Sequence, residues 1–417
     1  MRSYGVIIIG AGASGLVAGI CAARRGKSVL ILEKQEKSGH KIYATGNGKC
    51  NLTNMDMDNL DEKYKVVLGD KDENLEFVSN VLNRFSNSDT IEFFKDLGIL
   101  TYSRNGYVYP NSNQASSVVK LLLEEARSLK INIINSVRVS RVSIEVVGKR
   151  EVFKVYSDSE TYLSEKLCLA CGGKASPVYG TEGDGYDFLK SFNHKLSQIY
   201  PGLCPLKIKE EKNILKGWSG TRFYGSICID GKSEVGEFVL TDYGISGIPV
   251  FQMSLQCKEL LSNKRIMGSL NFLGDLSVTE REICDFLLDE VKNCKEPLLC
   301  DASVLLCGFL NEKIIDAIFK KLGIRGIKVD MLNPDLIKQI VSLIFNYPLE
   351  IIDFHGFERA QVTCGGAVLS EINCENMSSK IVDNLYVIGE LLDVTGICGG
   401  YNLQWAFSTG YLAGCNM

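Results

Sequence analysis

The first 33 residues contain the pattern that most constrains the fold of this chain. Val6 to Ile9 form a β-branched run typical of a buried parallel strand, and Gly10-Ala-Gly-Ala-Ser-Gly15 follows it directly. Leu16 to Arg25 has apolar and small residues at helical spacing, and a second short strand, Ser28 to Leu32, ends at Glu33. Strand, glycine-rich turn, helix, strand and acid in this order predict a Rossmann-type βαβ unit that binds a dinucleotide.

Each glycine of this turn has its own expected role. Gly10 makes the tight turn, Gly12 lets the backbone approach a pyrophosphate, and Gly15 lets the helix pack closely on the strand. The helix N-terminus offers free N–H groups and the positive end of its dipole to the phosphates. Glu33 lies where a carboxylate accepts hydrogen bonds from a ribose, and its charge disfavours the 2′-phosphate of NADP. A βαβ turn without a ligand is the alternative interpretation.

Composition restricts the class of protein. With 417 residues the chain is long enough for two or three domains, and 45% hydrophobic and 23% charged residues are typical of a globular protein. The net charge of −4 does not indicate nucleic acid or an anionic membrane as a partner. No apolar run is long enough to span a bilayer, and because a strand begins at the N-terminus we expect no secretory signal.

Cysteine is unusually frequent, with fifteen residues, whereas there are three histidines. The cysteine spacing fits neither a zinc ribbon nor a zinc finger, so no metal site is expected. Cys168 and Cys171 form a C-x-x-C, but they lie in an apolar run typical of a buried strand, which favours two buried thiols over a redox motif. Many cysteines without a secretory signal predict a reducing, cytoplasmic location.

The C-terminal segment returns to cofactor-binding chemistry. Asn384 to Glu390 is a strand that ends in Gly-Glu, and Gly399-Gly400 precedes a helix that begins with Tyr401. A carboxylate at a strand end can accept from a ribityl hydroxyl, and a helix N-terminus can stabilise negative charge at the N1–C2=O edge of a flavin. A loop before a buried helix is the alternative, but it does not explain the many polar residues in so short a stretch.

The middle of the chain has a different pattern. Residues 74–97 and 116–129 predict amphipathic helices, and residues 131–171 alternate in a way that predicts an antiparallel meander. From about residue 199 to 273 the chain is β-rich, and residues 278–344 are mostly helical in pattern. We interpret this middle region as an insertion with a β part followed by a small helical part.

Several motifs together resemble a known family. In chain order they are residues 10–15, Thr45-Gly-Asn-Gly-Lys-Cys-Asn-Leu-Thr-Asn54, residues 170–173, 183–185, 241–247, 363–366, and Gly389-Glu390 through Gly399-Gly-Tyr-Asn-Leu-Gln404. Over nearly its whole length the chain resembles the aminoacetone oxidase family of FAD-binding enzymes, which includes a bile-acid dehydroxylation flavoprotein. The resemblance implies an α/β fold with a Rossmann-like FAD-binding domain from both chain ends, 1–193 and 351–417. It also implies an inserted β-barrel-like domain, 194–275, and an inserted helical domain, 276–350.

Carried over by motif, the resemblance implies which residues bind FAD. The expected residues are Gly10, Gly12, Ala13, Ser14 and Gly15 at the pyrophosphate; Glu33 at the ribose, with Lys34 beside it; Lys41, Gly46, Lys49, Cys50 and Asn51 towards the flavin; Gly389 and Glu390 at the ribityl chain; Gly400, Asn402 and Leu403 at the pyrimidine edge; and Val139, by position alone, at the adenine. Lys49 and Tyr107 stand where the family often has Arg, and Asp242 where it often has His. If these positions contact substrate, the substrate differs from that of better-known relatives.

The expected function is an FAD-dependent oxidoreductase that transfers hydride between a small organic substrate and flavin N5. An oxidase, an NAD(P)H-fed reductase of a C=C bond and a dehydrogenase with another acceptor all remain open. No second G-x-G-x-x-G follows a clear strand, so NAD(P)H would bind only transiently. No residue stands out as catalytic: Tyr401, Asp242 and Cys50 are candidates by location only, and for Cys50 a buried thiol is the preferred interpretation.

Two functions of other classes are kept as alternatives. A flavin-dependent nucleic-acid-modifying protein is disfavoured by the acidic balance and the lack of a basic stripe. A non-catalytic flavin-binding sensor would bind FAD that no small-molecule donor reduces quickly. We expect a small-molecule substrate, with neither nucleic acid nor membrane as partner, whereas the substrate, the electron donor or acceptor and the oligomeric state are not determined by the sequence.

Overall fold

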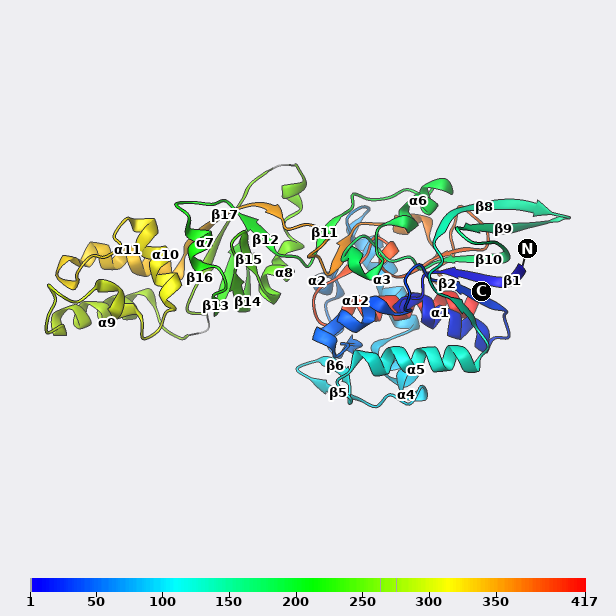
Figure 1. The fold of residues 1–417 in the computed structure, drawn as a ribbon, viewed down its shortest axis with the longest axis horizontal. Coiled ribbons are helices and arrows are strands. Elements are labelled where there is room, and N and C mark those ends of the chain that lie inside the picture. Colours follow the sequence, from blue (N-terminus) through cyan, green and yellow to red (C-terminus); the bar gives the residue numbers. More distant parts are fainter. Residues whose placement is uncertain (1, 263, 275) are drawn as a thin grey trace. The chain divides into compact units, whose positions relative to one another are not determined.

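A computed structural model describes residues 2–262, 264–274 and 276–417. The chain divides into two compact units, each of which is described by itself. Unit 1 comprises Met1–Gly202 and Gln361–Met417, and unit 2 comprises Leu203–Ala360. Unit 1 is therefore built from both ends of the chain, as the colours of its ribbon show (Figure 1). In the part of the chain that is described, no helix is long and apolar enough to cross a membrane.

Unit 1 is organised on a mostly parallel sheet. Its strands are β1 (Arg2–Ile9), β2 (Val29–Leu32), β7 (Asn132–Ile134), β8 (Val139–Val147), β9 (Arg150–Ser157), β10 (Thr161–Leu169) and β19 (Leu385–Val387). They follow the order β7-β2-β1-β10-β9-β8, with β19 also paired to β10. Strands β7, β2, β1, β10 and β19 pair in parallel, which is the predicted Rossmann-type arrangement.

Only part of the predicted meander is antiparallel. Strands β8, β9 and β10 form antiparallel pairs, and residues 132–134 instead pair in parallel with β2. The first segment of the predicted meander was therefore wrongly placed. Two short apolar strands that follow one another have the same alternating pattern whether they pair with each other or with a distant strand, because alternation records burial and not the partner.

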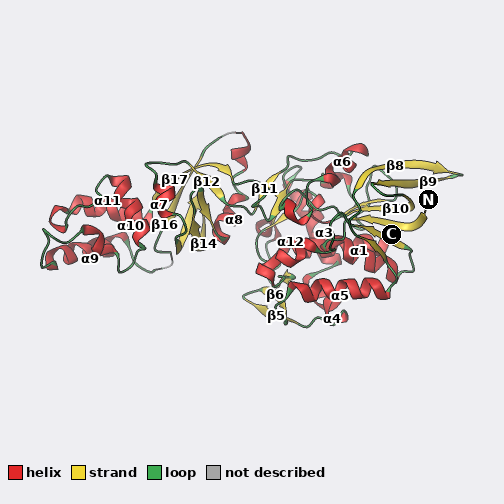
Figure 2. Ribbon diagram, viewed as in Figure 1, coloured by secondary structure: helices red, strands yellow, loops and turns green. Residues whose placement is uncertain are grey.

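Helices cover the sheet of unit 1 (Figure 2). They are α1 (Ala13–Arg24), α2 (Leu60–Lys63), α3 (Lys71–Arg84), α4 (Asn87–Asp96), α5 (Ala115–Ser128), α6 (Asp184–Ser191) and α12 (Tyr401–Asn416). The helix predicted for residues 74–97 is in fact two helices, because the Ser86 side chain accepts from the N–H of Asp89 and begins a new helix with a capping box. The remaining short strands are β3 (Thr53–Asn54), β4 (Tyr64–Lys65), β5 (Thr101–Arg104), β6 (Tyr107–Pro110), β11 (Tyr200–Gly202), β18 (Val362–Cys364) and β20 (Thr395–Gly396).

Unit 2 contains a closed antiparallel barrel, which confirms the predicted β-barrel-like fold. The barrel order is β12 (Leu206–Ile208), β15 (Gly244–Ser246), β14 (Lys232–Leu240), β13 (Arg222–Ile229), β16 (Ile266–Asn271) and β17 (Tyr347–Phe354). The helices of this unit are α7 (Ile214–Trp218), α8 (Ile248–Ser254), α9 (Glu280–Asn293), α10 (Glu312–Leu322) and α11 (Pro334–Phe345). Strand β17 follows these helices and pairs with both β12 and β16, so the expected domain boundary at residue 350 would divide a barrel strand.

A buried histidine ties three segments of unit 1 together. Nδ1 of His194 lies 3.0 Å from Oε2 of Glu371, and its Nε2 lies 2.8 Å from Oγ of Ser379. Oγ of Ser379 also accepts the backbone N–H groups of Ile381 and Val382, so it serves as a turn anchor and not as a nucleophile. Burial lowers the pKa of His194, although the Glu371 carboxylate acts in the opposite direction.

We expect unit 1 to lose stability as the pH falls from 7.5 to 5.5. The pKa of His194 is lower in the folded protein than its ordinary value of 6.5, so unfolding takes up a proton below that value. The stabilisation is fully present above pH 6.5 and is lost as the pH falls towards the folded pKa, with a slope of at most about 1.4 kcal/mol per pH unit. Urea unfolding midpoints measured at three pH values should show a weaker pH dependence in His194→Gln than in the wild type.

An equal pH dependence in His194→Gln and the wild type would contradict the assignment of this proton to His194.

Candidate functional site

The glycine-rich turn is closed against the sheet and open at one position. Gly10 has a φ of 107°, and a Cβ added to it would lie 2.4 Å from the carbonyl oxygen of Ala170. A Cβ on Gly15 would lie 2.0 Å from the carbonyl oxygen of Gly10, so the start of α1 packs directly on the turn. A Cβ on Gly12 would meet no atom within 4 Å. The turn thus presents Gly12 to an open space.

Helix α1 begins at this open position. Gly12 is its N-cap residue and no side chain caps the helix, so the first N–H groups, which include those of Ala13 and Ser14, are left for another acceptor. Such a helix end, with its positive dipole and unpaired donors, suits a phosphate group. The geometry therefore has the form that the sequence predicted for a pyrophosphate site.

Glu33 fixes the turn to the end of β2. Its Oε2 accepts the N–H of Ala11 at 2.8 Å, and its Oε1 accepts the N–H of Gln35 at 2.8 Å. Each carboxylate oxygen has a second lone pair, so these two bonds leave Glu33 able to accept from a ribose hydroxyl. The side chain consequently has a structural role that the sequence did not indicate.

Lys34 belongs to a cluster of charges. Its ammonium pairs with Glu182 at 3.0 Å and with Asp184, and the Arg138 guanidinium lies 2.5 Å from Asp184. Although burial alone would raise it, the pKa of Asp184 is lowered by the hydrogen bonds from Lys34 and Arg138. The charge of Lys34 is therefore already balanced, and its predicted contact with the cofactor stays a prediction. Val139, the predicted adenine contact, is buried at the start of β8.

An ion pair joins the two halves of the predicted site. Nζ of Lys41 lies 2.7 Å from Oε2 of Glu390, and Oε1 of Glu390 accepts the N–H of Thr363 at 2.8 Å. Thr363 was not predicted as a site residue, yet its Oγ1 accepts the N–H groups of Lys174 and Ala175 and so holds the loop after β10. The Thr-Cys-Gly-Gly motif was the sequence signal for this position.

The segment from Gly46 to Asn51 has an irregular backbone. Gly46 has a φ of 56° and Cys50 a φ of 62°, both in the left-handed region. The side chain of Lys49, between them, is exposed. Cys50 is fully buried, and this burial raises its pKa to about 12. Cys50 is therefore a neutral thiol at physiological pH, in agreement with its interpretation as a buried thiol and not as a catalytic group.

Asn51 lies beside the start of the C-terminal helix. Gly400, with a φ of 98°, is the N-cap residue of α12, and no side chain caps this helix. A Cβ on Gly400 would lie 2.6 Å from the carbonyl oxygen of Thr53 and 3.0 Å from Oδ1 of Asn51. Oδ1 of Asn51 is buried and has no hydrogen-bond partner among the described residues. A buried acceptor without a donor is costly, so it indicates a place for a ligand N–H group.

Asn402 has a structural role besides its predicted cofactor contact, which stays a prediction. Its Oδ1 accepts the N–H of Gly396 at 2.8 Å, and its Nδ2 donates to the carbonyl oxygen of Gly396 at 2.7 Å. This side chain holds the loop before α12, and only its backbone N–H remains for a cofactor. Leu403 is half-buried on the same helix. A Cβ on Gly389 would lie 2.6 Å from Oγ of Ser14, so the predicted ribityl and pyrophosphate positions are neighbours.

Two tyrosines stand at the Gly399 turn. A Cβ on Gly399 would lie 3.2 Å from the ring of Tyr107 and 3.2 Å from the ring of Tyr401. Asn54, which was not predicted, donates from Nδ2 to the carbonyl oxygen of Gly399 at 2.8 Å. The Tyr401 hydroxyl donates to the carbonyl oxygen of Asp56 at 2.8 Å, and burial raises its pKa. Its proton is thus already held by the protein backbone.

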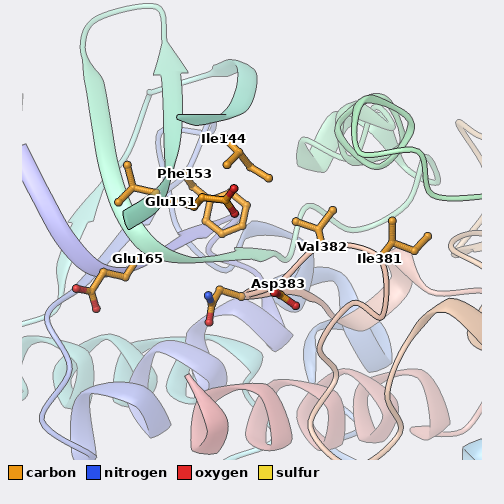
Figure 3. Close-up of a pocket in the computed structure, with 9 residues that line it drawn as sticks. Ile144, Glu151, Phe153, Glu165, Ile381, Val382 and Asp383 are labelled. Carbon is orange, nitrogen blue, oxygen red and sulfur yellow. The ribbon is translucent and has the colours of Figure 1, made fainter. Parts of the chain in front are cut away.

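Two further features contain none of the predicted cofactor-binding residues. Asp242 is an exposed residue of unit 2 between β14 and β15. A pocket of about 240 Å³ in unit 1 is lined by residues of β8, β9 and β10 and by residues 381–384 (Figure 3). Its lining carries Glu151, Glu165 and Asp383 beside apolar side chains such as Phe153. This pocket is distinct from the glycine-rich turn and the start of α12.

Comparison with known proteins gives a family and several relatives. The model of the HI0933-like protein Rossmann domain matches residues 4–416. The chain is 40% identical to the 3-dehydro-bile acid delta(4,6)-reductase of Clostridium scindens, over 98% of this chain and 97% of that protein. It is 28% identical to the ribosomal RNA dihydrouridine synthase of Haemophilus influenzae, over 97% of this chain and 96% of that protein.

A solved structure is similar at lower identity. The 3-ketosteroid-delta4-(5alpha)-dehydrogenase of Rhodococcus jostii RHA1 is 12% identical, with a TM-score of 0.47, over 99% of this chain and 96% of that one.

We expect Gly12→Val to weaken FAD binding without unfolding the protein. Its added carbons enter the open space in front of α1, where the backbone would approach a phosphate. A loss of about 1.4 kcal/mol or more, which is tenfold or more in Kd, should appear in a fluorescence titration of the apoprotein. The matched control is Gly308→Val in unit 2, where an added Cβ also meets no atom within 4 Å and FAD affinity should be unchanged. Equal affinities in both variants would contradict the predicted pyrophosphate site.

Gly15→Ala should instead destabilise the fold. Its Cβ would lie 2.0 Å from the carbonyl oxygen of Gly10, so the helix has to move away from the turn. Overpacking of this kind typically costs about 1–3 kcal/mol, which urea unfolding of the apoprotein would measure. A variant with wild-type stability would show that the turn can relax without cost.

Proposed function

Because this chain belongs to the HI0933-like family and is an FAD-dependent oxidoreductase, we propose that it reduces a C=C bond conjugated to a ketone in a small, largely apolar substrate, with NAD(P)H as electron donor. A 3-oxo bile acid or a related steroid with a 4-ene is the substrate class that we favour. Of the three reactions that the sequence left open, this is the NAD(P)H-fed reductase.

The relative from Clostridium scindens carries this proposal. Its name describes a reduction at positions 4 and 6 of a 3-dehydro bile acid, and it is 40% identical to this chain over nearly the full length of both. The aligned region covers both halves of the predicted cofactor site and the whole of unit 2. We therefore expect the two proteins to carry out similar chemistry.

The described residues of unit 1 fit FAD at three points. The open space at Gly12 and the uncapped start of α1 suit the pyrophosphate, and Glu33 can accept from the ribose. The unpartnered Oδ1 of Asn51 can accept from an N–H of the flavin ring, and the uncapped start of α12 can face its carbonyl edge. FAD, when bound, supplies the hydride-transfer chemistry. The helix start at Tyr401 would favour negative charge at that edge.

Lys41 and Glu390 would position the middle of the cofactor. Their ion pair of 2.7 Å orients both side chains, and Glu390 is also held by the N–H of Thr363. A carboxylate fixed in this way keeps a free lone pair towards a ribityl hydroxyl. Asn402 would act through its backbone N–H, since its amide already bonds Gly396.

No dedicated nicotinamide domain is present in the described part of unit 2. That unit consists of the closed antiparallel barrel and short helices, whereas a dinucleotide domain needs parallel βαβ units. We therefore propose that NAD(P)H binds transiently and leaves before the substrate is reduced. We also propose a cytoplasmic location, since all fifteen cysteines are free thiols.

A second candidate function is the reduction of uridine in ribosomal RNA. It is favoured by the names of two relatives, from Haemophilus influenzae and Escherichia coli, at 28% and 26% identity. Reduction of uridine also adds hydride and a proton across a C=C bond beside a carbonyl, so the same FAD site would serve. The lower identity and an excess of acidic residues, 50 against 46 basic ones, make RNA the less favoured substrate.

The deciding experiment is the visible spectrum of the purified protein without oxygen. We expect flavin bands that bleach on addition of NADH or NADPH and return when a 3-oxo-4-ene bile acid or 4-androstene-3,17-dione is added. Mass spectrometry should show a product heavier by two hydrogens. Bands that do not bleach, or that return only with oxygen, would contradict the reductase proposal.

An unmodified ribosomal RNA fragment serves as the competing acceptor in the same assay. Dihydrouridine formation with RNA, and no reoxidation by either steroid, would establish the second candidate. Absence of flavin bands after reconstitution with FAD would overturn both.

A further inference from the structure

Helices α1 and α12 lie side by side in unit 1 and touch at two glycines (Figures 1 and 2). A Cβ on Gly410 would lie 2.5 Å from the carbonyl oxygen of Ser14, and a Cβ on Gly414 would lie 2.4 Å from that of Ala18. The two glycines and their two contacts are each four residues apart. The helices therefore run in the same direction in contact, with glycine on the α12 side.

The next turn of this contact brings two cysteines together. A Cβ on Gly414 would lie 2.7 Å from Cβ of Cys21, and Cys415 follows Gly414 in the chain. Cys21 is 4% exposed and Cys415 is half-buried. Each thiol shifts the pKa of the other, so the two are neighbours, and the thiol that solvent reaches lies beside one that is enclosed.

The surroundings shift the pKa values of these two thiols in opposite directions. The hydrogen bond from Cys21, the positive charge of Arg25 and the Tyr411 hydroxyl lower the pKa of Cys415 to about 6, against the effect of its burial. The same pairing and burial raise the pKa of Cys21. The surroundings thus favour the thiolate at the accessible sulfur and the thiol at the enclosed one, which is the arrangement of a reactive and a resolving cysteine.

The C-x-x-C motif contrasts with this pair. Cys168 and Cys171 have pKa values raised by burial, to about 12 for Cys171. Both are protonated at neutral pH, in agreement with their interpretation as buried thiols.

We propose that Cys415 and Cys21 form a peroxide-reactive site in which oxidation links α12 to α1 by a disulfide. The Cys415 thiolate attacks hydrogen peroxide, the O–O bond breaks, and with one proton from solvent the products are Cys415 sulfenic acid and water. The Cys21 thiol then attacks the sulfenic sulfur, the S–S bond forms, and a second water leaves. Two thiol groups and one peroxide thus give one disulfide and two waters.

The disulfide would join the first helix of the chain to the last. A crosslink between positions so far apart in the sequence restricts the unfolded chain strongly, so the oxidised protein should resist heat better than the reduced one. It would also fix the two helices whose starts are the predicted contacts of the pyrophosphate and the flavin edge. Both cysteines lie in unit 1, and the disulfide forms without the proposed reduction of a C=C bond.

Peptide mapping of the full-length protein with bound FAD tests the proposal. The protein is reduced with a phosphine, desalted, treated with hydrogen peroxide at pH 7 and quenched with N-ethylmaleimide. Chymotrypsin is used without reductant, because cleavage after Phe407 or Tyr411 separates Cys398 from Cys415. We expect a crosslinked Cys21–Cys415 peptide and a higher Tm than in the reduced protein. Absence of this peptide while other thiols are oxidised would overturn the proposal.

The reactive thiolate is tested by alkylation with iodoacetamide at pH 6.5. Cys415 should be labelled several-fold faster than the exposed Cys307, because Cys21, Arg25 and Tyr411 lower the pKa of Cys415. Equal rates for Cys415 and Cys307 would contradict the proposal even if a crosslink forms slowly.

Two variants separate the roles within the pair. In Cys21→Ser the sulfenic acid on Cys415 has no resolving thiol, so dimedone should trap it and the Tm should not rise. In Cys415→Ser peroxide should leave Cys21 reduced. If either variant fails to fold, the crosslinked peptide and the labelling rates of the wild type still decide the question. Trapping of dimedone at Cys21 in place of Cys415 would reverse the assigned roles.

Discussion

The close approach of α1 to its neighbours is the constraint on which unit 1 depends. At Gly15 the helix touches the turn before it, and at Gly410 and Gly414 it touches the last helix of the chain, each time at a distance that a methyl group would prevent. These contacts set the middle of α12 beside the start of α1, so α12 begins ahead of α1 along their common direction. Because one helix is encoded near residue 13 and the other near residue 401, the predicted cofactor site exists only when both chain ends have packed.

Two carboxylates hold the loops of the predicted site on the packed helices and sheet. Glu33 ties the glycine-rich turn to the end of β2, and Glu390 ties the loop around Lys41 to the backbone at Thr363. Both groups are thus oriented by the protein itself and need no ligand to hold them in place. A site in which the acceptors are already positioned loses less conformational entropy on binding, which favours tight retention of a cofactor. The same two side chains therefore serve stability and recognition.

The sequence predicted the features that depend on local chemistry. The Rossmann-type unit, the tight turn at Gly10, the close packing at Gly15 and the helix that begins at Tyr401 follow from residue type and spacing, because backbone conformation and helix ends are local properties. The division of the helix at Ser86 and the parallel pairing of residues 132–134 were not predicted, since competing caps and strand partners have nearly equal patterns. The hydrogen bonds of the Asn402 amide and the proximity of Cys21 to Cys415 could be identified only from the structure. Side-chain partners that lie far apart in the sequence leave no periodic pattern in it.

The position of α12 after the inserted unit has a consequence for synthesis. Unit 2 lies between the two parts of unit 1, so all of its barrel strands have left the ribosome before Tyr401 is added. Until the sixteen residues of α12 emerge, the face of α1 that carries Ser14, Ala18 and Cys21 lacks this cover and is exposed to water. The inserted unit can fold first, whereas the larger unit waits with an apolar helix face open. Nascent chains halted before α12 is complete would on this basis be the species that chaperones recognise.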